Sequence, residues 1–178
     1  KLPLAAAPEE LGTPRFTRHR REIAPPVWSA FRLAAASVGV SASAAMLALF
    51  AEVLRLWGAQ ENFALNVTLF DRPLEFVDAE RIIGDFTTTA LVDVRSVGER
   101  FVEHALTVGK SFWEAIDHSS VTGVEVARMA NEMGAPREDR IVFTSALDGA
   151  TQRPSGGSGS RSTGNPAEWL GTEVFGVS

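Results

Sequence analysis

The chain has 178 residues, of which 45% are hydrophobic and 22% charged, and its formal net charge at pH 7 is −5. This composition is typical of a globular protein and excludes a disordered chain, a collagen or a coiled coil. The acidic balance provides no basic field for nucleic acid. The absence of cysteine excludes disulfides, thiolate nucleophiles and cysteine-bound zinc, and it suits a cytoplasmic protein.

Residues 1–24 contain three prolines and little periodicity, which predicts an extended connector. We expect its basic cluster to be solvated; the cluster consists of Arg15, Arg18, His19, Arg20 and Arg21. No signal segment opens the chain, and residues 174–178 resemble the start of a strand. We therefore expect both ends to be cuts through a longer polypeptide.

Two helices are predicted next. Pro25 and Pro26 suit a helix start, and apolar residues recur at helical spacing until Gly39. Ser41 or Ser43 can cap a second helix that ends near Gly58. We expect its buried face to consist of Met46, Leu47, Phe50, Val53, Leu54 and Trp57, and we expect Trp28 and Trp57 to pack in the core. No stretch of about 20 residues is apolar throughout, so no membrane span is expected.

Alternating residues predict strands over 62–70 and 87–94, with a short helix near 78–82 between them. Helices are predicted over 97–117 and 121–134, and the apolar run 141–147 predicts a buried strand. Residues 148–168 are rich in glycine, serine and proline, which predicts a flexible loop. The alternation of helices and strands indicates an α/β fold with helices layered on a sheet.

Several common catalytic motifs are missing from the sequence. It contains no phosphate-binding loop, no dinucleotide-binding glycine motif, no nucleophile elbow and no zinc-binding His-Glu-x-x-His helix. The three histidines lie in separate settings. We expect His118 to cap a helix end, where a cation is favourable, and His104 to lie on the exposed side of its helix.

Six segments nevertheless carry a resemblance. They are LPLAAAP at 2–8, SASAAMLALFAEVLRLW at 41–57, LNVTLFDR at 65–72, GDFT with ALV at 84–92, DH with VTGV at 117–124, and IVFTSAL at 141–147. In this order and at these separations they resemble the heterocyclization domains of nonribosomal peptide synthetases. These domains are relatives of condensation domains and make thiazoline and oxazoline rings, for example in siderophores.

The resemblance implies a fold like that of chloramphenicol acetyltransferase, in which two α/β lobes form a V around a tunnel. The phosphopantetheine arms of upstream and downstream peptidyl carrier domains enter this tunnel, and no cofactor or metal is bound directly. Residues 1–24 resemble the linker between the lobes, and residues 25–178 resemble a truncated C-terminal lobe. The N-terminal lobe with its Asp-x4-Asp motif, and a later catalytic aspartate, are not in this sequence. We therefore expect the fragment to be inactive alone.

The resemblance also implies site residues. Thr144 matches the family threonine, and its hydroxyl could position the missing aspartate or polarise the amide oxygen. Asn66 could hold an acyl or amide oxygen. Ser145 points to the opposite strand face from Thr144, so at most one of the two faces the tunnel. Asp85 and Arg72 are candidates for a supporting ion pair, and Thr87 for the tunnel wall.

Each of these residues also has a structural explanation. Thr144 can satisfy a buried carbonyl, and Asn66 can link a strand to a loop. Two further functions remain open at this point. One is an ordinary amide-forming condensation domain, and the other is a non-catalytic scaffold that docks carrier domains.

Overall fold

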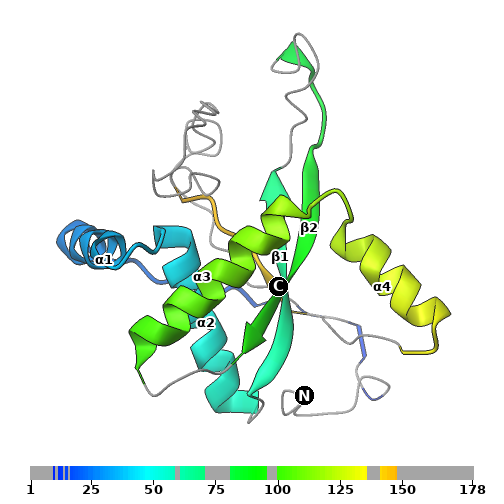
Figure 1. Ribbon diagram of the computed structural model, residues 1–178, viewed down its shortest axis with the longest axis horizontal. Coiled ribbons are helices and arrows are strands. Elements are labelled where there is room, and N and C mark those ends of the chain that lie inside the picture. The colour runs from blue at the N-terminus through cyan, green and yellow to red at the C-terminus, as the bar shows by residue number, and fades with distance from the viewer. Residues whose placement is uncertain are drawn as a thin grey trace.

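The computed structural model describes residues 10, 12, 13, 15, 17–58, 61–70, 81–95, 100–135 and 141–147. Within these ranges, helices lie on both faces of a mixed three-stranded sheet (Figure 1). The predicted α/β fold with layered helices is therefore confirmed. The predictions for the loop 148–168, the final strand and most of the helix near 78–82 fall outside the described residues.

The first two helices form where the sequence predicts them. Helix α1 (Pro25–Ser37) has proline in its first turn, and Gly39 follows its end with a φ of 77°, a left-handed value that glycine adopts without strain. Helix α2 (Ala42–Gly58) is capped by Ser41, whose Oγ accepts a hydrogen bond from the backbone N–H of Ala44 at 3.2 Å. That bond satisfies one of the free donors at the helix start.

The buried face of α2 agrees with the prediction in part: Leu47 is buried, and Phe50 and Leu54 are half-buried against the core. The structure buries the small side chains of this helix together with one leucine: Ser43, Ala44, Ala45, Leu47, Ala48 and Ala51. Val53 is exposed, and Trp57 keeps 73% of its surface exposed, so its predicted core position is wrong. Trp28 is half-buried and stacks on Phe31 with ring centroids 5.5 Å apart. A helix lined with alanine can approach its neighbours closely, which favours the small residues over the large ones.

The sheet has the strand order β2-β1-β3. Strands β1 (Asn62–Phe70) and β2 (Thr87–Arg95) pair antiparallel along their full length, from Asn62 opposite Arg95 to Phe70 opposite Thr87. Strand β3 (Val142–Phe143) pairs parallel to β1, with Val142 opposite Asn66. The predicted seven-residue strand at 141–147 is thus reduced to two residues, because the chain leaves the ladder before Thr144.

The last two helices lie on opposite faces of the sheet. Helix α3 (Phe101–Asp117) starts later than predicted and packs with α2 on one face, whereas α4 (Gly123–Glu132) contacts β2 on the other (Figure 1). His104, predicted to be exposed, is only 6% exposed. It precedes Val108 by one helical turn, so it belongs to the buried stripe of α3.

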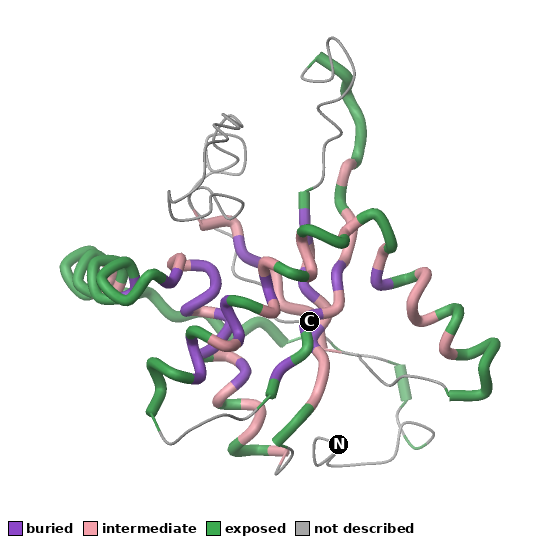
Figure 2. Tube along the Cα trace, viewed as in Figure 1, coloured by how far each residue is buried: buried purple, intermediate pink, exposed green. Residues whose placement is uncertain are grey.

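The core lies between the sheet and the pair α2–α3, where Figure 2 shows the buried segments together. Its largest fully buried side chains are Leu47, Leu65, Val92, Val94 and Val108. Each such side chain contributes about 1.5–3 kcal/mol when it leaves water. Among the described residues no single helix is long and apolar enough to cross a membrane; α1 and α2 pass that test only as a pair, and they are bent by 99°.

Candidate functional site

The sheet face away from α2 and α3 carries a group of polar side chains, which we call the polar face: Asn66, Thr68, Thr89 and Thr144. In β1, Asn66 and Thr68 alternate with the buried Leu65, Val67 and Leu69, so they point to the opposite side. Thr89 lies directly opposite Thr68 in the β1–β2 register and therefore shares its face. The polar face thus draws residues from three segments far apart in the sequence.

A side-chain hydrogen bond joins two of these segments. The Oγ1 atoms of Thr68 and Thr144 lie 2.9 Å apart, and both residues are half-buried. Asn66 pairs with Val142 in the parallel ladder, two residues before Thr144. The two predicted site residues Asn66 and Thr144 are therefore brought to the same face of one sheet.

The start of helix α4 closes over the polar face. A Cβ on Gly123 would lie 2.8 Å from Thr89 Oγ1 and 3.1 Å from Asn66 Oδ1, so only glycine fits between the helix and the strands. Thr122 caps the helix in a reciprocal box: its Oγ1 accepts from the backbone N–H of Glu125, and Glu125 accepts from the backbone N–H of Thr122 at 2.8 Å. The Glu125 carboxylate accepts hydrogen bonds from the backbone N–H of Thr122 and, at 3.0 Å, from the Thr122 hydroxyl, and these two bonds, the backbone one first, hold the pKa of Glu125 below its ordinary value.

Ser145 faces the other way, as expected for neighbours along an extended chain. Its Oγ lies 3.3 Å from Ser43 Oγ of α2, and the residue is 7% exposed. Of the Thr144–Ser145 pair, only Thr144 joins the polar face. The Ser145 hydroxyl instead ties the segment after β3 to helix α2.

Thr87 is the exposed first residue of β2, and Asp85, also exposed, lies two residues before it. Asp85 Oδ1 accepts a hydrogen bond from the backbone N–H of Thr87 at 2.8 Å. Hydrogen bonds from the Thr87 side chain and backbone lower the pKa of Asp85. Arg72 lies outside the described residues, so its predicted ion pair with Asp85 stays a prediction. Thr87 has the strand parity of Thr89, and its place in a tunnel wall also stays a prediction.

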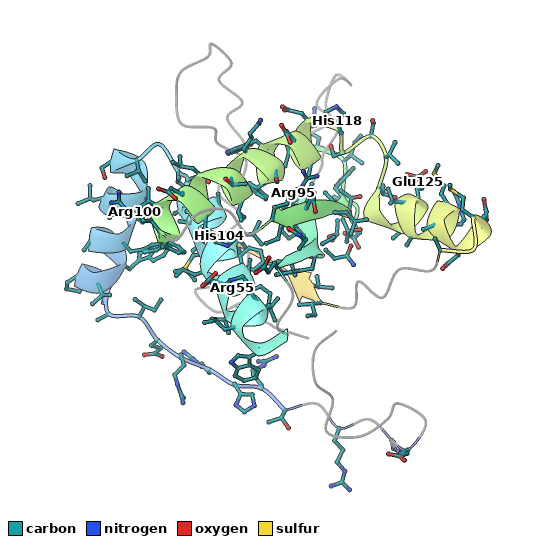
Figure 3. The ribbon with its side chains drawn as sticks, turned by 60° about the horizontal axis from the view of Figure 1, so that its bottom comes forward. Arg55, Arg95, Arg100, His104, His118 and Glu125 are labelled. Atoms are coloured by element: carbon teal, nitrogen blue, oxygen red, sulfur yellow. The ribbon has the colours of Figure 1, made fainter. Side chains whose placement is uncertain are left out.

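The described histidines are away from the polar face. The ring Nδ1 of His118 lies 2.8 Å from the carbonyl oxygen of Glu114, and the residue caps α3, as predicted. His104 lies on α3 where that helix packs beside α2, and its buried Nε2 has no hydrogen-bond partner (Figure 3). Within the described ranges, no three His, Asp or Glu side chains gather as a metal ligand set would.

Three residues of this region were not singled out from the sequence: Thr68, Thr89 and Gly123. A signal existed for the first two, because Thr68 follows Asn66 by two positions and Thr89 follows Thr87 by two. Strand periodicity alone therefore places each with its predicted neighbour. Nothing in the sequence marks Gly123 as the point where a helix touches the sheet.

Comparison with known proteins covers most of the chain. No family model matches it. Pyochelin synthetase PchE of Pseudomonas aeruginosa is 36% identical over 147 residues, which are 82% of this chain and 10% of PchE. Phenyloxazoline synthase MbtB of Mycobacterium tuberculosis is 33% identical over 135 residues, 75% of this chain and 10% of MbtB. The chain thus spans about a tenth of the length of these relatives.

Solved structures that are similar to this chain also include domains of nonribosomal peptide synthetases. The cyclization-docking bidomain of the nonribosomal peptide synthetase EpoB from Sorangium cellulosum superposes with a TM-score of 0.70 and 31% identity, covering 85% of this chain and 31% of the bidomain. The first condensation domain of the calcium-dependent antibiotic synthetase superposes with a TM-score of 0.52 at 18% identity, over 63% of this chain and 25% of that one. At that identity the second likeness concerns the fold alone.

Proposed function

We propose that this chain, which belongs to the cyclization domains of nonribosomal peptide synthetases, supplies one wall of a site that forms thiazoline or oxazoline rings. In this proposal residues 25–178 are the C-terminal lobe of the domain and residues 1–24 link it to the preceding lobe. The observation that carries the proposal is that Asn66 and Thr144 lie on one sheet face, where Thr144 is hydrogen-bonded to Thr68 and Asn66 lies beside Gly123 at the start of α4.

The proposed reaction has two stages. First, the amine of a carrier-bound cysteine, serine or threonine attacks the carbonyl carbon of an acyl thioester; a C–N bond forms, the C–S bond breaks, and the carrier thiol leaves. Second, the side-chain thiol or hydroxyl adds to the new amide carbonyl. Loss of the former carbonyl oxygen as water then creates the C=N bond of the five-membered ring. Holding both arms in near-attack geometry lowers the barrier of each addition.

The residues of the polar face suit the second stage. Departure of water requires a hydrogen-bond donor at the amide oxygen, and the Thr144 hydroxyl can both donate and accept. The Asn66 amide can hold the same oxygen or that of the acyl donor through its NH₂ group. Neither side chain is acidic enough to be the proton source itself, so another group of the intact domain must supply the proton. We assign that role to an aspartate beyond these residues, which Thr144 then orients.

The proposal also names partners. The substrates arrive on the phosphopantetheine arms of upstream and downstream peptidyl carrier domains, and the opposing wall of the tunnel is the N-terminal lobe of the same domain. No cofactor is bound directly, and the reaction takes place in the cytoplasm. The relatives' names support this context, since one synthesises pyochelin and another forms a phenyloxazoline.

The test is Thr144→Ala in the intact protein that contains this chain, supplied with loaded carrier domains. We expect the rate of ring formation to fall about a hundredfold, as when one donor is removed from an oxyanion site, while amide formation continues. Mass spectrometry of the product distinguishes the linear amide from the ring, which has lost one water. Thr88→Ala, on the opposite sheet face, is the matched control.

Three outcomes would refute parts of this proposal. Equal ring yield from Thr144→Ala would remove Thr144 from the chemistry. Amide without ring from the unaltered protein would indicate an ordinary condensation domain. Carrier binding without consumption of thioester would indicate a docking scaffold.

A further inference from the structure

The hydrogen bond between Thr68 and Thr144 connects a strand interior to a residue outside the ladder. Strand β3 pairs with β1 only at Val142 and Phe143, so Thr144 follows the last paired residue. Its partner Thr68 lies in the interior of β1, which is paired along its whole length with β2. The Oγ1–Oγ1 distance of 2.9 Å joins residues 76 positions apart. The hydroxyl of Thr144 is therefore fixed by a side chain of the neighbouring strand rather than by its own strand.

The next residue is held from the other side. Ser145 Oγ faces Ser43 Oγ on α2 at 3.3 Å and is buried, so it fixes the backbone just after Thr144 without touching the polar face. With the backbone held there, the remaining freedom of Thr144 is the rotation of its side chain. A threonine outside regular structure has more than one staggered position for its hydroxyl. The bond to Thr68 selects one of them.

We propose that Thr68 is a positioning residue for ring formation, which rests on the role proposed above for Thr144. Either hydroxyl could donate in this 2.9 Å contact; the proposal assigns the donor role to Thr68, which leaves the hydrogen of Thr144 to point away from β1 toward the reacting amide oxygen. A hydroxyl that accepts a hydrogen bond also becomes a better donor, because chained hydrogen bonds polarise one another. Thr68 itself does not touch the substrate in this arrangement.

The experiment compares three variants of the intact protein. Thr68→Val keeps the branched shape and removes the hydroxyl, whereas Thr68→Ser keeps the hydroxyl. Thr88→Val makes the same chemical change on the opposite face, where Thr88 lies opposite Leu69 of the core. We expect Thr68→Val to slow ring formation about tenfold, the worth of one neutral hydrogen bond, and to leave amide formation unchanged. Linear amide then accumulates, Thr68→Ser restores most of the ring yield, and Thr88→Val behaves as the unaltered protein.

A purely structural role for Thr68 would give a different pattern. It would slow both stages alike and lower the thermal unfolding temperature, and either that result or an unchanged ring yield would overturn the proposal. The double variant Thr68→Val/Thr144→Ala must form rings no more slowly than Thr144→Ala alone, because Thr68 acts through Thr144. If Thr144→Ala slows ring formation while Thr68→Val leaves its rate unchanged, the positioning role fails and the proposed function stands. If Thr144→Ala has no effect, both fail.

Discussion

Replacing Gly123 by alanine tests how helix α4 rests on the sheet. An added Cβ would lie 2.8 Å from Thr89 Oγ1, which is 0.6 Å less than the 3.4 Å at which ordinary contact begins. Asn66 Oδ1 at 3.1 Å and the carbonyl oxygen of Thr89 at 3.4 Å close the remaining directions. The carbonyl belongs to a paired strand and cannot move aside, so the helix must shift outward or Thr89 must rotate.

Two effects of opposite sign set the magnitude. Alanine is favoured over glycine by about 0.5–1 kcal/mol in a helix interior, and by less at Gly123, which is the first residue of α4. Overpacking in a tight contact costs about 1–3 kcal/mol. We therefore expect Gly123→Ala to lower the free energy of unfolding by about 1 kcal/mol, which lowers Tm by about 2–4 °C in a chain of this size.

Gly109 of α3 provides the matched control. A Cβ there would meet Ala44 Cβ at 3.7 Å and Val40 Cγ1 at 3.9 Å, both ordinary contacts. Gly109→Ala should therefore raise the free energy of unfolding by about 0.5–1 kcal/mol. Thermal and denaturant unfolding of the full 178-residue chain measure both variants, which should shift in opposite directions.

If Gly123→Ala stabilises the chain as much as Gly109→Ala does, helix α4 does not rest on the strands as described. A second check is the pair Gly123→Ala/Thr89→Ala, which removes the nearest obstructing oxygen. The double variant should lose less stability than the two single variants added together.

Two further predictions concern single contacts. Ser43→Ala leaves the buried Ser145 hydroxyl without its partner and should lower the free energy of unfolding, measured with denaturant, by about 1–2 kcal/mol. The double variant Ser43→Ala/Ser145→Ala should lose less than the sum of the two single variants. Strictly additive losses would contradict the pairing of the two hydroxyls. Because the pKa of Glu125 is lowered from 4.5, its charge stabilises the folded chain above that pH and the benefit is lost as pH falls through the lower folded value. Glu125→Gln should therefore be less stable than the unaltered chain at neutral pH and equal to it in acid, and a difference independent of pH would contradict the capping role.

Local periodicity predicted the elements well. The alternation in residues 62–70 gave the correct faces of β1, and the proline pair and Gly39 placed α1 within a few residues. Helix α1 could be predicted although only one of its thirteen side chains, that of Ala35, is buried, because its start and end are marked by local residues. Signals of this kind act within a few residues, so a sequence displays them directly.

Features that depend on distant partners were not predictable. The sequence suggested large apolar residues for the buried face of α2, but apart from Leu47 the fully buried positions of this helix hold alanine and serine, while Trp57 and Val53 are exposed. His104 is buried because α2 covers that side of α3. The site was predicted in part: Asn66 and Thr144 were named, yet their meeting depends on a parallel register between segments 76 residues apart. No local pattern encodes such a register.

The polar face comes from three separate segments of the chain, which matters when synthetases are recombined. A chimera joined anywhere between Arg95 and Val142 takes Thr68 and Thr89 from one parent and Thr144 from the other. Each parental segment can then fold correctly while the hydrogen bond between positions 68 and 144 is lost. A chimera whose breakpoints lie outside Asn62–Thr144 takes the whole polar face from one parent. Where a breakpoint must lie inside this range, both parents should have a hydroxyl residue at the positions of Thr68 and Thr144.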